Sequence, residues 1–146
     1  LASLIAEGNP DAVMIDQTMK RYGFNISNRR DDRSICAVDR ILNITEEYGI
    51  NHLDSVLYVI SKGFNGTSVA LTSTMLGGMS AFLARVRDND TFDREYFIGK
   101  LQELTPNIVK NMITTQSIGS PKESLRERAD KVFRAIYNNR RRKNII

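Results

Sequence analysis

Residues 73–87 read Ser73-Thr-Met-Leu-Gly-Gly-Met-Ser-Ala-Phe-Leu-Ala-Arg-Val-Arg87. Apolar residues recur here at intervals of three and four, the spacing that gathers side chains on one face of an α-helix. This broad stripe consists of Met75, Leu76, Met79, Phe82, Leu83 and Val86. Each glycine within a helix costs roughly 1 kcal/mol relative to alanine. Gly77-Gly78 therefore predicts that a neighbouring helix approaches this one closely.

Helical spacing continues on both sides of this segment. One helix is expected to follow Asn9-Pro10, an N-cap with proline at the first helical position, and another to follow Asn51 as its N-cap. The predicted helices cover about 10–22, 37–48, 51–62, 93–104 and 105–113. The residues expected to face the core from them are Ala12, Ile15, Met19, Tyr22, Val38, Ile41, Leu42, Leu53, Val56, Leu57, Ile60, Phe97, Leu101, Leu104, Ile108, Val109, Met112 and Ile113.

Three predicted helices end at a glycine that is followed by an apolar residue. The triplets are Tyr22-Gly23-Phe24, Tyr48-Gly49-Ile50 and Lys62-Gly63-Phe64. Glycine readily adopts the left-handed conformation that closes a helix, and the next apolar side chain can fold back onto the last turn. Tight corners of this kind predict a compact helical domain rather than a long coiled coil.

Residues 24–36 have two interpretations. They are polar and irregular at their centre, and residues 24–27 and 33–36 are compatible either with a loop or with the two arms of a β-hairpin. The predicted fold class is therefore all-α, a compact multi-helix domain of about seven or eight helices. One short β-hairpin near residues 24–36 is left open. The length of 146 residues fits a single domain.

The clearest helix start in the chain is Ser120-Pro121-Lys122-Glu123. It combines an N-cap, proline at the first helical position and glutamate three residues after the cap. The helix that follows has an apolar face made of Leu125, Ala129, Val132, Phe133 and Ile136. The basic residues expected to lie away from that face are Arg126, Arg128, Lys131 and Arg134. We predict a helical body over residues 1–119 and a basic amphipathic helix over 120–146, packed on the same domain.

Positive charge is concentrated at this end of the chain. The net charge is +4, yet residues 120–146 hold nine basic and three acidic side chains. The preceding 119 residues are slightly acidic, with 12 basic and 14 acidic side chains. The excess positive charge is therefore a property of the last helix and not of the body.

Composition also bears on the location of the protein. No apolar run approaches the roughly 18 residues that cross a bilayer, and no signal peptide is recognisable. The single cysteine cannot form an internal disulfide, which suits a reducing compartment. We expect a cytoplasmic protein that does not enter a membrane. Because residue 1 is leucine and not methionine, we also expect a fragment of a longer protein.

The sequence contains no recognisable catalytic or metal-binding pattern. Nucleophilic catalysis needs a nucleophile, a base and an orienting group. His52 and Cys36 are the only residues of their types; His52 is expected to be structural or solvated, and Cys36 to be a small core residue. Asp88-Asn-Asp90 lacks the glycine and glutamate of a calcium loop. Glu46 and Glu47 diverge by about 100° on a helix, so they are expected to be solvated. We expect no enzymatic activity, no metal, no cofactor and no small-molecule substrate.

A helix-turn-helix around Gly49 is one alternative for binding DNA. The first turns of its recognition helix contain Asn51, His52, Asp54 and Ser55. None of these is a lysine or arginine that meets phosphates. Simple packing of the two helices is therefore the preferred interpretation.

The final helix is the stronger candidate for binding. Each contact between a basic side chain and a phosphate releases counterions without reading the base sequence. The residues expected to bind duplex DNA are Arg126, Lys131, Arg134, Arg140, Arg141, Arg142 and Lys143. The nearby aromatic residues are only Phe133 and Tyr137, which disfavours stacking of single strands. A solvated basic face, an acidic protein partner and a membrane surface are the alternatives.

Oligomerisation or another protein–protein contact is a second class of function. The apolar stripe of residues 75–86 and the apolar face of the last helix are each broad enough to form an interface. A homodimer, or another protein–protein complex without nucleic-acid binding, is therefore the alternative function.

Seven short phrases also occur in a particular order. They are Glu7-Gly-Asn-Pro-Asp-Ala12, Tyr22-Gly-Phe-Asn-Ile26, Ile35-Cys-Ala-Val38, Tyr48-Gly-Ile-Asn-His-Leu-Asp-Ser-Val-Leu-Tyr-Val-Ile60, Phe64-Asn-Gly66, Met75-Leu-Gly-Gly78 and Ala135-Ile-Tyr-Asn-Asn-Arg-Arg-Arg142. Together they resemble the C-terminal helical region of ParB-like proteins of phages and mobile elements, in which a ParB/sulfiredoxin-type N-terminal domain comes first. The resemblance implies a helical accessory module in a DNA-handling context. It implies no catalytic residue, because the motifs of the N-terminal domain have no match here.

Overall fold

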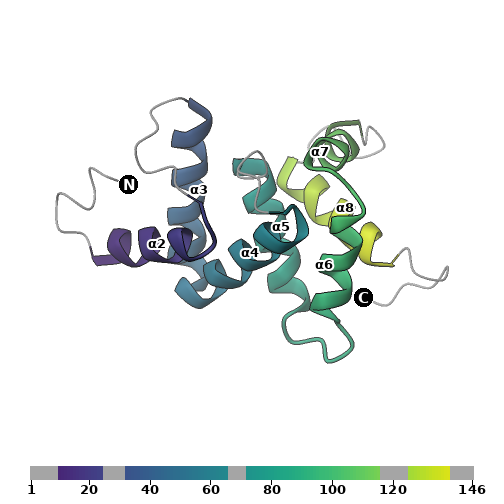
Figure 1. Ribbon diagram of the computed structural model, residues 1–146, viewed down its shortest axis with the longest axis horizontal. Coiled ribbons are helices and arrows are strands. Elements are labelled where there is room, and N and C mark those ends of the chain that lie inside the picture. Colours follow the sequence, from purple (N-terminus) through teal and green to yellow (C-terminus); the bar gives the residue numbers. More distant parts are fainter. Residues whose placement is uncertain (1–9, 25–31, 66–71, 116–124, 139–146) are drawn as a thin grey trace.

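The computed structural model describes residues 10–24, 32–65, 72–115 and 125–138, and every regular element in these ranges is an α-helix (Figure 1). The seven helices are α2 (Pro10–Arg21), α3 (Asp32–Tyr48), α4 (Ile50–Gly63), α5 (Ser73–Val86), α6 (Arg94–Gln102), α7 (Pro106–Thr115) and α8 (Leu125–Asn138). The prediction of an all-α, multi-helix fold is confirmed for this part of the chain.

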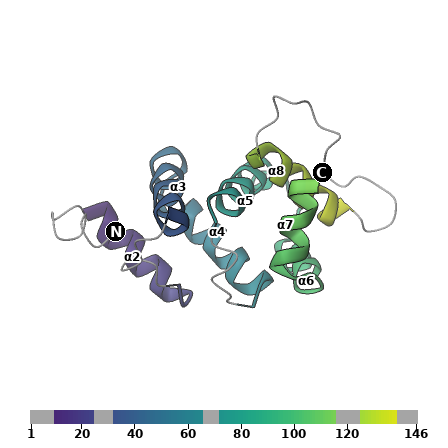
Figure 2. The same cartoon turned by 90° about the horizontal axis from the view of Figure 1, so that it is seen from above.

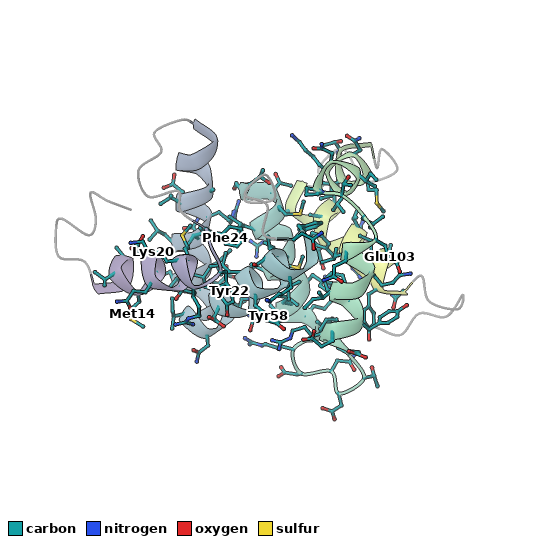
Figure 3. The ribbon with its side chains drawn as sticks, viewed as in Figure 1. Met14, Lys20, Tyr22, Phe24, Tyr58 and Glu103 are labelled. Atoms are coloured by element: carbon teal, nitrogen blue, oxygen red, sulfur yellow. The ribbon has the colours of Figure 1, made fainter. Side chains whose placement is uncertain are left out.

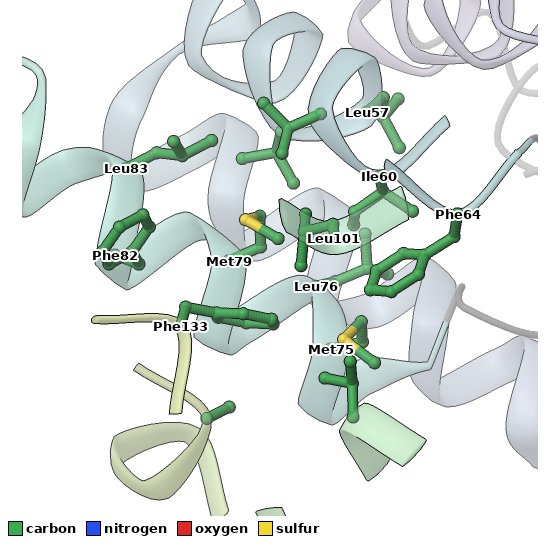
Figure 4. Packing of buried hydrophobic residues seen from close by; sticks show 14 of the residues in the cluster. Leu57, Ile60, Phe64, Met75, Leu76, Met79, Phe82, Leu83, Leu101 and Phe133 are labelled. Carbon is green, nitrogen blue, oxygen red and sulfur yellow. The ribbon is translucent and has the colours of Figure 1, made fainter. Parts of the chain in front are cut away.

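Helix α5 occupies the centre of the molecule. It packs against α3, α4 and α8, and α8 in turn contacts α6 and α7. Figure 2 shows α5 between α3 and α8, with α2 at one end of the molecule and α6 and α7 at the other. All six residues of the predicted α5 stripe are buried, with at most 5% of their surface exposed. Figure 4 shows Phe133 of α8 beside Phe82 and Met79 of this stripe.

The two glycines of α5 are where α8 comes closest. A Cβ atom on Gly78 would overlap the Cβ of Ala129 and lie 3.3 Å from its Cα. One on Gly77 would lie 3.5 Å from the Cγ and Cδ atoms of Arg126. The predicted close approach of a neighbouring helix is therefore confirmed, and the neighbour is α8. Since Gly78 faces Ala129 and Phe82 lies near Phe133, the two helices run in the same direction.

Two of the three glycine corners have the expected backbone. Gly23 and Gly49 have φ angles of 80° and 92°, values that favour glycine. At the end of α2, the amides of Gly23 and Phe24 donate hydrogen bonds to the carbonyls of Lys20 and Met19, as in a Schellman cap. Phe24 is buried, as the predicted folding back of the apolar residue requires.

The prediction is wrong for Gly63. This residue is the last of α4, and an added Cβ would lie 2.7 Å from Cδ1 of Leu101, so close packing with α6 accounts for the glycine. The residue with positive φ at this corner is Asn65, at 56°. Asn51 is also not the N-cap of α4. The single residue Gly49 joins α3 to α4 and holds the N-cap position itself, without a side-chain cap.

The hairpin alternative is wrong for its second arm. Residues 33–36 are the beginning of α3, which starts at Asp32, and residues 25–31 lie outside the described residues. A hairpin with arms of four residues is marginal in water unless it packs on other elements. Both alternatives, loop and hairpin, are therefore wrong for residues 33–36, and α3 begins about one turn before the predicted start at residue 37.

Helix α7 turns only part of its expected face inward. Val109 and Ile113 are buried, but Ile108 and Met112 are 46% and 36% exposed, so their predicted core positions are wrong. The reason is that α7 packs mainly on α8, and this one neighbour covers only a narrow side of α7. Local spacing predicts the apolar face but not how much of it a neighbour covers.

Helix α8 packs on α5, α6 and α7. Ala129, Val132, Phe133 and Ile136 are all buried, and so is Tyr137. The Tyr137 hydroxyl accepts a hydrogen bond from the Asp93 amide at 2.9 Å and donates to the Thr91 carbonyl at 3.2 Å. The predicted start at Ser120 and the side chain of Leu125 lie outside the described residues.

Candidate nucleic-acid interface

The predicted phosphate-binding residues fall into two groups. Arg126, Lys131 and Arg134 lie on α8, whereas residues 140–143 lie outside the described residues. Lys131 is exposed and Arg126, Arg128 and Arg134 are half-buried, so the arginine side chains lie partly against the domain. A long arginine stem packs along apolar surface while its charged end reaches solvent. The arginines are therefore held by the fold.

Arg126 meets a second arginine from a distant helix. The Nε atom of Arg40, on α3, lies 3.3 Å from the Cβ position of Gly77, beside the Arg126 stem at 3.5 Å. The same Nε donates a hydrogen bond to Oγ of Ser73 at 3.3 Å. No described carboxylate forms a salt bridge with Arg40 or Arg126. Two guanidinium-bearing side chains thus converge over the first turns of α5.

Arg134 has a carboxylate beside it. Asp130, one turn earlier on α8, lies 2.5 Å from Arg85 of α5 and 4.0 Å from Arg134 through the same oxygen, Oδ2. The Asp130 side chain is only 8% exposed, whereas Arg85 is 51% exposed. The pair therefore joins α5 to α8 and offsets part of the positive charge at this place. The α8 sequence alone does not show that Arg134 shares its carboxylate with another helix.

Arg40 and Arg85 are members of this surface that the sequence-based prediction missed. A signal for Arg85 exists, because Gly77, Ala81 and Arg85 recur at intervals of four and share one face of α5. Arg126, Asp130 and Arg134 recur in the same way along α8. Nothing in the local sequence connects Arg40 with these rows, since its proximity depends on how α3 packs against α5.

The helix-turn-helix alternative is at odds with the side chains at the start of α4. His52 is buried, and its Nε2 lies 3.0 Å from the Ser80 carbonyl oxygen. Asp54 accepts hydrogen bonds from Nη1 of Arg21 at 2.7 Å and from the Tyr22 hydroxyl at 2.8 Å. Tyr22 in turn packs edge-on against Tyr58, with 6.1 Å between the ring centroids; both residues are labelled in Figure 3. These contacts engage His52 and Asp54 within the domain, as simple helix packing requires, whereas Asn51 is exposed.

Burial also acts on the protonation of His52. Removal from water lowers the pKa of the ring below its ordinary value of 6.5. The hydrogen bond with the Ser80 carbonyl opposes this change, and the charge of Arg87 reinforces it. The lone histidine is therefore a structural residue rather than an exposed acid or base.

The other residues considered for chemistry have ordinary surroundings. Glu46 and Glu47 are exposed, as expected. Asn89 stabilises its own loop, because its Oδ1 accepts hydrogen bonds from the amide and hydroxyl of Thr91 at 2.9 and 2.6 Å. Within the described ranges, no three histidine, cysteine or acidic residues gather as metal ligands, and no helix is long and apolar enough to cross a membrane. The Cys36 side chain lies outside the described part.

The two faces predicted as protein interfaces are covered within the chain. The α5 stripe and the apolar face of α8 bury each other and the neighbouring helices. Large exposed apolar side chains lie elsewhere, on α2 at Val13 and Met14 and on α7 at Ile108 and Met112. Met112 borders a hollow between α6, α7 and α8 that Leu104, Ala135 and Ile136 also line.

Comparison with known proteins identifies no relative. No protein-family model, no curated protein and no solved structure matches the chain. The function is therefore argued from the arrangement of the residues themselves.

Proposed function

We propose that the chain is a non-catalytic, DNA-associated helical module of a ParB-like protein, which binds the phosphates of duplex DNA through α8 and the basic run after it. The observation that carries the proposal is the placement of charge. Residues 120–146 hold nine basic and three acidic side chains, and the rest of the chain is slightly acidic. A basic element on a slightly acidic body directs a polyanion to one place.

The arrangement of α8 favours contact with phosphates over reading of bases. Its two aromatic residues, Phe133 and Tyr137, are completely buried, so neither is accessible to stack on a base. Its basic side chains lie along exposed and half-buried positions, and Lys131 is among the exposed ones. Binding of this kind is independent of sequence and falls steeply as the salt concentration rises.

A salt titration of duplex-DNA binding tests the proposal. Replacing residues 140–143 with alanine removes four cations and is expected to weaken binding at low salt by about 10-fold or more, with a shallower dependence on salt. The matched control is Lys20→Ala, which removes a 60% exposed cation from α2 at the far end of the molecule (Figure 1). Absence of binding by the intact chain at low salt, or equal binding by both variants, contradicts the proposal.

Self-association is the second candidate, and the exposed pair Ile108 and Met112 on α7 favours it. A second copy is the simplest partner that would cover these side chains and the adjoining hollow. Sedimentation at micromolar concentration tests this candidate. A strict monomer contradicts it.

A further inference from the structure

We infer that the DNA-binding surface is a seam between α3, α5 and α8, in which Arg40 and Arg126 hold one phosphate and Arg85, positioned by Asp130, holds another. This inference rests on the proposed function. It adds residues of the acidic body to a surface that sequence analysis assigned to the last helix alone.

The first phosphate position lies over Gly77. Arg40 and Arg126 both contact the Cβ position of this glycine, which has room for two arginine stems because it has no side chain of its own. Neither arginine forms a salt bridge with a described carboxylate. Like charges held together repel, and a phosphate placed between them relieves the repulsion and accepts hydrogen bonds from both guanidinium groups.

The second phosphate position lies beside Asp130, one turn after Arg126 on α8. Asp130 is buried, and its Oδ2 holds Nη2 of Arg85 at 2.5 Å. A guanidinium group has five N–H donors, so this contact leaves most of them for a ligand. Half of the Arg85 side chain remains exposed, and Arg134 adds a second positive charge beside the same carboxylate. Asp130 therefore acts as a positioning residue, and this part of the seam keeps a net positive charge.

The two positions belong to one continuous surface. Gly77 and Arg85 lie on the same face of α5, eight residues apart, which corresponds to about 12 Å along the helix. Arg126 and Arg134 keep the same separation along α8, which runs in the same direction. The guanidinium group of Arg85 ends at Asp130, which stands one turn after Arg126 on α8, about 6 Å along that helix. A polyanion such as the backbone of a duplex can present neighbouring phosphates to both positions.

The test compares seam variants of the full chain in binding to a fluorescent DNA duplex over a range of salt concentrations. The plot of log K against log salt has a negative slope, and each lost phosphate contact makes it less steep by about 0.9. The double variant Arg40→Gln/Arg126→Gln is expected to lose about one contact, and the triple variant with Arg85→Gln about two. The matched control is Arg87→Gln, because Arg87 is exposed at the end of α5 and its charge acts on His52 instead.

The outcomes separate this inference from the proposed function. If the wild-type chain does not bind the duplex, the proposed function fails and the inference fails with it. If the wild type binds and loses affinity in the 140–143 variant, but the seam variants behave like Arg87→Gln, only the inference is overturned. If inorganic phosphate displaces the fluorescent duplex as well as unlabelled duplex does at matched ionic strength, the ligand is not a polyanion and the inference is overturned.

A second measurement on the wild-type chain does not depend on the folding of variants. Phenylglyoxal modifies accessible arginines, and mass spectrometry reports the extent at each one. Bound duplex is expected to protect Arg40 and Arg85 and to leave Arg87 and Arg94 unchanged. Equal modification of Arg40 and Arg85 with and without the duplex overturns the inference.

Discussion

His52 shows what a single residue contributes to this fold. Its ring lies against Tyr48, with 4.6 Å between the ring centroids, and its Nε2 meets the carbonyl of Ser80 on α5. Because a carbonyl oxygen only accepts hydrogen bonds, the neutral ring carries its proton on Nε2. The residue therefore joins α4 to α5 as an uncharged donor. Sequence analysis left a structural and a solvated histidine open, and burial decides for the structural one.

The buried histidine makes stability depend on pH. The pKa of His52 is lowered in the folded chain, so as the pH falls the unfolded chain binds this proton first. The stabilisation from the neutral ring is fully present above the unfolded pKa of about 6.5 and is lost as the pH falls from there to the folded pKa. We expect the free energy of unfolding, measured with urea between about pH 8 and pH 5, to decrease below about pH 6.5.

The control is His52→Gln, whose side-chain amide can still donate to Ser80 but binds no proton in this range. Its unfolding free energy is expected to change less over the same pH interval. If the free energies of unfolding of the two proteins change in parallel with pH, the pH dependence comes from groups other than His52.

The glycines of α5 and α6 act at the scale of the helical element. Gly78 lies where the backbone of α8 passes, so an alanine there cannot be accommodated by rotating a side chain. Gly78→Ala is expected to destabilise the protein by about 1–3 kcal/mol, although alanine favours the helix itself. Gly99 of α6 is the matched control, since an added Cβ there meets nothing within 4 Å. Gly99→Ala is expected to stabilise by about 0.5–1 kcal/mol in the same urea measurement.

A double variant separates the contact from helix propensity. Ala129→Gly removes the methyl group that Gly78→Ala would meet. Combining the two substitutions is expected to cost less than the sum of the two single effects. Strict additivity would falsify the view that Gly78 is present for the approach of α8.

At the scale of the whole molecule, α8 is part of the core and not an appendage to it. It covers α5 with Phe133 and Ala129, and its Tyr137 joins the aromatic cluster of Phe82, Phe92 and Phe97. A division into a body and a last helix therefore describes charge but not stability. The helices on both sides of α5 share one apolar cluster.

Truncation tests this view directly. A chain of residues 1–119 is expected to lose its cooperative thermal unfolding, measured by circular dichroism, because the apolar side of α5 is then exposed to water. A chain of residues 1–138 is the control. It lacks the basic run 140–143 but keeps every residue of the core, and is expected to unfold cooperatively. Cooperative unfolding of residues 1–119 would show that α8 is dispensable.

The sequence by itself determined the helical segments apart from the first turn of α3, the place where two of the corners turn, and the place where the positive charge is concentrated. The period of apolar residues in 73–87 and the glycines at 23 and 49 are local signals, because they act through neighbours within one or two turns. The Gly77-Gly78 pair also predicted that a neighbouring helix approaches this one closely. The concentration of basic residues after residue 120 follows from composition alone.

Tertiary structure alone decided which residues meet. It placed Ala129 on Gly78, brought Arg40 beside Arg126, paired Asp130 with Arg85, and left Ile108 outside the core. These contacts join residues far apart in the chain, and periodicity within a helix carries no information about which helix lies opposite. For the same reason the last helix could be recognised as basic from its sequence, while the arginines that α3 and α5 add beside it could not.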